Sequence, residues 1–303
     1  MMRSNILFVS ILMCMGILLV TCRSKTKTTI KKSDSYLVND FVQDKDFPAG
    51  MEELQIPSGD VKIYGFIYLS NGPGPHPTLV FIHGNPGNER NLDLAQNLRK
   101  VGYNVVYFDF RGSWGSKGKF TFENNIADTK AVIDYISSDQ NSGRLRIDTA
   151  KIAIFGHNTG GAIGLIAGLA HPKVKGVATL SLFNPYRVIT NSEGTSNLIS
   201  MKEYLATLGM LDINPDEFLM EMASNVNQYN LEELLQKTNK PVLMIDEHEG
   251  NDYVKALTVR KNIQYEVWDT DITFSNKRTA LTRRLRTWAD KGINPPKPVS
   301  KTK

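Results

Sequence analysis

The pentapeptide Gly156-His157-Asn158-Thr159-Gly160 constrains the fold more than any other part of the chain. Glycines two positions before and two after an apex residue are needed where a strand turns sharply into a helix. The apex of such a turn normally carries a serine whose hydroxyl becomes a nucleophile. The amide of Asn158 is neither acidic enough nor nucleophilic enough to replace that hydroxyl. The pentapeptide therefore predicts the turn and argues against its usual chemistry.

Short runs rich in Val, Ile and Phe alternate with helical patterns, which is typical of a mostly parallel sheet with helices on both faces. We expect eight strands, the first two forming an antiparallel hairpin, at residues 51–56, 62–69, 78–82, 104–108, 151–155, 176–182, 241–245 and 264–268. We expect helices with an apolar stripe at residues 91–101, 124–137, 159–170 and 277–291. The polar segment 186–237 interrupts this alternation, and we expect it to form a small lid over the C-terminal edge of the sheet.

The first 22 residues have the composition of an export signal. A charged start is followed by an apolar run from Ile6 to Val20, which is too short for a comfortable membrane span. The run ends in Leu19-Val20-Thr21-Cys22, which resembles the lipobox of bacterial lipoproteins, although Thr21 replaces the usual Gly, Ala or Ser. We therefore expect lipidation at Cys22 and anchoring to a membrane of the bacterial cell envelope. Ordinary cleavage, which gives a periplasmic or secreted protein, and an uncleaved anchor are the alternatives.

Charge and composition divide the rest of the chain. Residues 23–45 are expected to be a flexible tether, residues 46–293 a folded domain, and residues 294–303 a disordered Pro- and Lys-rich tail. The net charge is +5, but basic residues in the two end segments contribute +9, which leaves −4 for the remainder. Basic ends near an anionic membrane explain this distribution, so nucleic-acid binding is not expected. Maturation at Cys22 would remove Cys14 and exclude an internal disulfide.

Three motifs stand at the ends of successive predicted strands. They are His83-Gly84-Asn85-Pro86-Gly87 after the third, the segment from Asp109 to Ser116 after the fourth, and the pentapeptide after the fifth. Together they resemble the α/β-hydrolase superfamily, especially its dienelactone-hydrolase-like and prolyl-oligopeptidase-like members. The resemblance runs from about Met51 to Gly292 and implies the α/β-hydrolase fold, with a central sheet of eight mostly parallel strands.

The resemblance also implies roles for single residues. The backbone N–H groups of Asn85 and Thr159 correspond to the oxyanion hole, which stabilises negative charge on a carbonyl oxygen. The acid of the catalytic triad follows the seventh strand, where Asp252 is the better match. The catalytic histidine follows the eighth strand, where this chain has Ile272. With Asn158 at the apex, both the nucleophile and the base of the family are replaced.

Loss of both groups favours a non-catalytic or severely weakened domain that acts as a binding or scaffold protein. Its pocket would suit a small acyl, ester or peptide ligand. The alternative is an esterase or peptidase with a rearranged site, in which His248 serves as a substitute base. A histidine in so polar a segment is more often simply a solvated residue. Structural roles are expected for His157, beside the apex, and for His83.

No metal or cofactor is expected. The carboxylates near His248 lack a second histidine or cysteine at ligand spacing. The glycines from Gly156 to Gly161 fit neither the phosphate-binding loop of nucleotide hydrolases nor the dinucleotide-binding motif.

Overall fold

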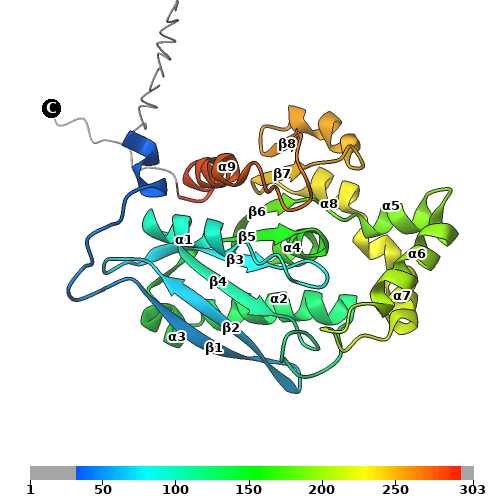
Figure 1. Ribbon diagram of the computed structural model, residues 1–303, viewed down its shortest axis with the longest axis horizontal. Coiled ribbons are helices and arrows are strands. Elements are labelled where there is room, and N and C mark those ends of the chain that lie inside the picture. Colours follow the sequence, from blue (N-terminus) through cyan, green and yellow to red (C-terminus); the bar gives the residue numbers. More distant parts are fainter. Residues whose placement is uncertain (1–31, 295–303) are drawn as a thin grey trace, which may run out of the picture.

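The structure is a computed structural model that describes residues 32–294, and one eight-stranded sheet organises this part of the chain (Figure 1). Its strand order is β1-β2-β4-β3-β5-β6-β7-β8. The β1–β2 and β2–β4 pairs are antiparallel and the others are parallel. The strands are β1 (Gly50–Ser58), β2 (Val61–Leu69), β3 (His76–Ile82), β4 (Asn104–Asp109), β5 (Ile147–His157), β6 (Val174–Leu180), β7 (Val242–Asp246) and β8 (Ile263–Val267). All eight predicted strands and the initial hairpin are confirmed.

Helices cover both faces of the sheet (Figure 1). The helices α1 (Leu92–Lys100) and α9 (Arg278–Gly292) pack on one face, whereas α2 (Phe122–Ser137) and α4 (Thr159–Ala170) pack on the other. These are the four helices that the apolar stripes predict. A short helix that the pattern does not predict, α3 (Asp139–Arg144), follows α2 and contributes no buried residue.

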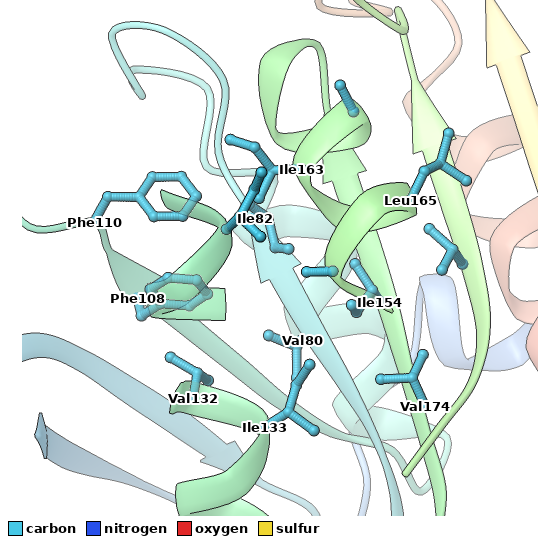
Figure 2. Close-up of a cluster of buried hydrophobic side chains, with 14 of the residues drawn as sticks. Val80, Ile82, Phe108, Phe110, Val132, Ile133, Ile154, Ile163, Leu165 and Val174 are labelled. Carbon is cyan, nitrogen blue, oxygen red and sulfur yellow. The ribbon is translucent and has the colours of Figure 1, made fainter. Parts of the chain in front are cut away.

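Neighbouring residues of the central strands belong to the cores on opposite faces. Val80 and Ile82 of β3 lie in the apolar cluster beneath α2 and α4, and Figure 2 shows them near Ile154 and Ile163. Leu79 and Phe81, which alternate with them along β3, lie in the cluster beneath α1 and α9. Every residue of β3 is buried. Burial on both faces explains why these strands read as nearly continuous apolar runs in the sequence.

The segment between β6 and β7 folds into short helices. They are α5 (Pro185–Thr190), α6 (Gly194–Ala206), α7 (Pro215–Ser224), the 3-10 helix η2 (Val226–Tyr229) and α8 (Leu231–Lys237). Figure 1 shows α5, α6 and α7 gathered at one end of the molecule, at the right of the view. Phe218 and Met222 of α7 are buried in the core cluster. The insertion therefore has helical structure at the predicted place, and its action as a lid stays a prediction.

Part of the predicted tether is held against the domain. Residues 32–37 form a 3-10 helix, η1 (Lys32–Leu37), which lies beside α9 in Figure 1. Asp34 forms an ion pair with Arg283 at 3.0 Å, and the guanidinium of Arg286 lies 4.6 Å from the centre of the Tyr36 ring. Tyr36 is buried by this packing. A buried aromatic residue thus fixes part of a segment that composition alone predicts to be flexible.

The predicted export signal, Cys22 and residues 295–303 of the predicted tail lie outside the described residues. Within residues 32–294, no helix combines the length and the apolar character that crossing a membrane requires.

Candidate active site

The strand β5 turns into α4 at a single residue, Asn158. Its backbone has φ 51° and ψ −116°, a conformation that is strained for any residue other than glycine. The turn is held because the Asn158 N–H donates to the Leu180 carbonyl at 2.8 Å, and the Asn158 carbonyl accepts from the Gly161 N–H at 2.9 Å. A strained apex that is fixed on both sides projects its side chain at the C-terminal edge of the sheet.

The two glycines of the pentapeptide are required by close backbone contacts. A methyl group on Gly156 would lie under 3.0 Å from the carbonyl of Gly160, and one on Gly160 would lie under 3.0 Å from the carbonyl of His83. Neither neighbour is the end of a flexible side chain, so neither can move aside at low cost. The glycine spacing in the sequence therefore reports the geometry of this turn.

The side chain of Asn158 is held by two hydrogen bonds. Its Nδ2 donates to the carbonyl of Ser181 at 3.2 Å, and its Oδ1 accepts from the hydroxyl of Thr159 at 3.2 Å. Both ends of the amide are used, so the group behaves as a structural link between α4 and the residue after β6.

The two residues predicted to form the oxyanion hole share a cavity with Asn158. Asn85 and Thr159 line a cavity of about 350 Å³ whose other walls come mainly from α5, α6 and α7. Neither backbone N–H donates to another group within residues 32–294. Both donors are therefore available to an oxygen atom of a ligand, while their role in binding one stays a prediction.

This first cavity is mainly apolar. Beside Asn85, Asn158 and Thr159, it is lined by Phe183, Val188, Asn197, Ser200, Met201, Tyr204, Leu205 and Phe218. The hydroxyl of Tyr204, on α6, donates to the carbonyl of Asn85 at 2.9 Å. This bond joins the insertion to the turn that follows β3. A mainly apolar wall that ends at two N–H donors suits a ligand with a hydrocarbon part and a carbonyl group.

Ile272 lies on the wall of a second cavity, of about 560 Å³, which is also lined by Gly84, His157 and Asn158. The loop that carries Ile272 follows β8, and the Ile272 side chain is about half exposed. The structure thus brings Ile272 and Asn158 to one cavity, as the resemblance implies. An aliphatic side chain at this place cannot carry a proton.

The histidines of the two motifs have structural contacts. His157 Nε2 donates to the carbonyl of Ile272 at 2.9 Å, and burial lowers the pKa of its ring. His83 Nδ1 donates to the carbonyl of Gly84 at 2.7 Å, and the ring packs edge-on against Phe110. Burial lowers the pKa of His83 to about 4. Both rings are therefore neutral near pH 7 and hold loops in place, in agreement with the structural roles expected for them.

The carboxylates after β7 are placed differently from each other. Asp252 begins the 3-10 helix η3 (Asp252–Val259), pairs with Lys255 at 2.7 Å and lines none of the cavities at Asn158. Asp246 is fully buried and accepts from the Leu182 N–H at 2.8 Å, and burial raises its pKa. Glu247 accepts a hydrogen bond from the hydroxyl of Ser181. Of these three carboxylates, Glu247 is the one linked to Asn158 through Ser181, and the acid role of Asp252 stays a prediction.

Sequence reasoning missed Ser181. This buried residue follows β6 with φ 50°, and its carbonyl accepts from Asn158. Besides Glu247, its hydroxyl reaches the carbonyl of Ile272 at 3.3 Å. It thus links the turn at Asn158 with the loops after β7 and β8. The sequence holds a weak signal for this role, since Ser181 is the next-to-last residue of the predicted strand 176–182, at the edge where the other motifs end.

His248 lines a third cavity that also reaches Asn158. The residue is exposed, and its Nδ1 accepts from the Gly250 N–H at 3.0 Å. The lone pair that a general base needs is therefore occupied by the backbone. Within residues 32–294, no group of three or more His, Cys, Asp or Glu side chains is arranged to hold a metal ion.

The fold and the strained turn define a domain of the α/β-hydrolase class. The chain belongs to the BD-FAE family, whose model matches residues 67–258. It is similar to the alpha/beta hydrolase domain-containing protein WAV2 of Arabidopsis thaliana, with 32% identity over 146 residues that cover 47% of this chain and 45% of WAV2. An uncharacterized protein of Mycobacterium tuberculosis is 27% identical over 140 residues, which cover 46% of this chain and 47% of that protein. The chain spans about half the length of the curated relatives it matches.

Solved structures of esterases share the fold. The esterase Est1E from Butyrivibrio proteoclasticus, in its complex with ferulic acid, superposes with a TM-score of 0.61 and 17% identity over 79% of this chain and 99% of Est1E. An esterase from Pyrococcus furiosus gives a TM-score of 0.58 and 19% identity over 84% of this chain and 96% of its own. The expected fold class is thereby confirmed.

Proposed function

We propose that this protein binds the acyl part of an ester in the cavity beside Asn158 and hydrolyses it very weakly or not at all. The observation that carries the proposal is the state of the apex. Asn158 stands where a nucleophile is needed, its amide is engaged at both ends, and Ile272 contributes an aliphatic side chain to the neighbouring cavity. A carbonyl group can be bound here, but in the described part of the chain the apex offers no hydroxyl and the position of Ile272 offers no base to attack it.

The available N–H groups of Asn85 and Thr159 support the binding step. Two donors directed at a carbonyl oxygen stabilise it whether or not a nucleophile follows. The walls of this cavity, which include Phe183 and Leu205, are mainly apolar. They favour a ligand whose carbonyl group meets the two donors and whose hydrocarbon chain lies along the walls. Together these features favour a small ester or acyl ligand.

A carboxylic-ester hydrolase or peptidase with a rearranged site is the second candidate, favoured by the BD-FAE match and the esterase structures. It needs a substitute nucleophile and base. Ser181 has a carboxylate partner in Glu247, but it is buried, so a substrate reaches it only after the neighbouring loops move. His248 needs to release the Gly250 N–H before it can accept a proton. For these two reasons we favour a binding protein with little or no hydrolysis over an efficient hydrolase with a rearranged site.

The predicted lipidation at Cys22 would place this activity on a membrane of the bacterial cell envelope, with the predicted tether between the anchor and the domain. Metabolic labelling with a palmitate analogue, compared between the full chain and its Cys22→Ala variant, tests that part of the proposal. Label in the full chain and none in the variant supports lipidation, whereas equal labelling contradicts it.

Binding is tested by ligand-detected NMR titration of the purified protein with methyl hexanoate. The Ser200→Trp variant fills the first cavity from an exposed position on α6, so it should abolish the signal. The Ala206→Trp variant adds the same ring to an exposed position of α6 outside the cavity wall and should leave binding intact. Equal binding by both variants would contradict the assignment of this cavity to the acyl group.

A further inference from the structure

The cavity that His248 lines lies beside the first cavity, which we call the acyl cavity, and shares Asn158, Phe183 and Val188 with it. Its volume is about 350 Å³, and we call it the alcohol cavity. Its remaining walls are Leu182, Asn184, Arg187, Asn191, His248, Gly250 and Asn251. The wall has one guanidinium, one imidazole and several amides, and none of its residues carries a carboxylate. Such a lining favours an anionic or strongly polar group.

Arg187 supplies the positive charge of this cavity. Its guanidinium lies 4.0 Å from the centre of the Tyr253 ring, and one nitrogen, Nη2, forms an ion pair with Glu232 at 3.3 Å. Stacking on the ring holds the planar group in position, and a guanidinium has five N–H donors in a fixed arrangement. Within the described residues Glu232 uses only the Nη2 end of the side chain. The other donors are available to a carboxylate or a phosphate.

His248 and Asn251 add further polar contacts. The Nδ1 atom of His248 accepts from the Gly250 N–H, so a neutral ring carries its proton on Nε2. No other described group contacts this Nε2–H. The side chain of Asn251 is 1% exposed and its Nδ2 donates twice, while its Oδ1 has no partner among the described residues. A buried oxygen without a donor is costly, so it favours a hydroxyl group on the ligand.

We infer that the alcohol cavity binds the alcohol part of the ester and selects an alcohol that carries an anionic group, either a carboxylate or a phosphate. This inference rests on the proposed function, because the acyl cavity must hold the other half of the same molecule. Asn158 stands between the two halves, at the place of the ester bond. Arg187 binds the anion, and the residues around Asn251 accommodate the polar remainder.

The experiment compares three hexanoyl esters by ligand-detected NMR titration of the purified protein. Methyl hexanoate has a neutral alcohol, hexanoyl glycolate carries a carboxylate, and the hexanoyl ester of ethylene glycol monophosphate carries a phosphate. We expect at least one anionic ester to bind about tenfold more tightly than methyl hexanoate at low salt. The stronger of the two anionic esters identifies the anion that the cavity prefers.

The Arg187→Gln variant should lose this preference and keep the affinity for methyl hexanoate. The control is Lys202→Gln, which also removes one positive charge. Lys202 belongs to α6 and lines a different groove, between α6 and α7. This control should retain the preference. Equal affinities of the wild type for all three esters, or a preference that survives in Arg187→Gln, would overturn the alcohol cavity while leaving the acyl cavity standing. Absence of binding by all three esters would instead overturn the proposed function.

Discussion

The carbonyl oxygen of Ile272 accepts a hydrogen bond from His157 Nε2 at 2.9 Å. This bond fixes the loop after β8 against the residue that precedes the strained apex. A histidine placed at this position would therefore start from a backbone that already lies beside Asn158.

The double variant Asn158→Ser with Ile272→His is therefore expected to gain esterase activity. A positioned general base contributes roughly 10²–10⁴-fold in rate, and we expect a gain near the lower end because the supporting carboxylate has not been matched to it. The measurement is the hydrolysis rate of nitrophenyl butyrate, with each single variant as a control. A stably folded double variant with the wild-type rate would mean that more of the site has diverged than these two positions.

Gly160→Ala is expected to destabilise the protein by about 3 kcal/mol, because the added methyl would press on the carbonyl of His83. Urea unfolding followed by circular dichroism measures this change. Gly143→Ala is the matched control, since its methyl would meet nothing within 4 Å and the residue lies inside α3. The control should be neutral or stabilising by roughly 0.4–1 kcal/mol. Equal stabilities of the two variants would contradict the steric argument for the turn.

The stability of the protein should fall as the pH drops from 6.5 toward 4. Burial lowers the pKa of His83 to about 4, so the unfolded chain binds a proton in this range and the folded chain does not. The contribution is complete above the unfolded pKa and is lost as the pH falls toward the folded pKa. His157 acts in the same direction.

The measurement is the free energy of unfolding between pH 4 and pH 7 for the wild type and the His83→Asn variant. Near pH 5 the free energy of unfolding should change less steeply with pH in the variant than in the wild type. The difference in slope should be about 1.4 kcal/mol per pH unit, the value for one proton. Parallel curves for the two proteins would show that His83 is not buried in its neutral form.

Tyr204→Phe should loosen α6 without disturbing the core. The variant removes the hydroxyl that donates to the Asn85 carbonyl and leaves the ring in place. The net loss is expected to be about 1 kcal/mol. Faster amide hydrogen exchange confined to α6 and its neighbours would support a role of this bond in closing the acyl cavity. Unchanged exchange in α6 would mean that other contacts hold this helix in place.

Most of the fold could be predicted from the sequence because the buried strands and amphipathic helices impose their own periodicity. The turn at Asn158 could also be predicted from the sequence, because the structure leaves no room for side chains at its two glycines. The helix η1 could not be predicted in the same way. It is stabilised by contacts of Tyr36 and Asp34 with α9, a helix that follows more than two hundred residues later.

The candidate site was predicted only in part. Asn85, Thr159 and Ile272 lie around Asn158 because parallel strands bring their C-terminal ends to one edge of the sheet. The contact between Ser181 and Glu247 joins residues 66 positions apart and depends on how two neighbouring loops fold back. Local sequence patterns carry little information on such a contact. The same holds for Asp252, whose place at the start of η3 is set by its bonds to Lys255 and Tyr265.

The central claim is that the apex asparagine supports binding and not efficient hydrolysis. Its most direct test is the turnover of a panel of short- and medium-chain nitrophenyl esters by the purified protein, beside its Asn158→Ala variant. The account predicts that both proteins give the same low rate, close to that of the buffer. Turnover well above the buffer rate that collapses in the variant would contradict it, because Asn158 would then take part in the chemistry.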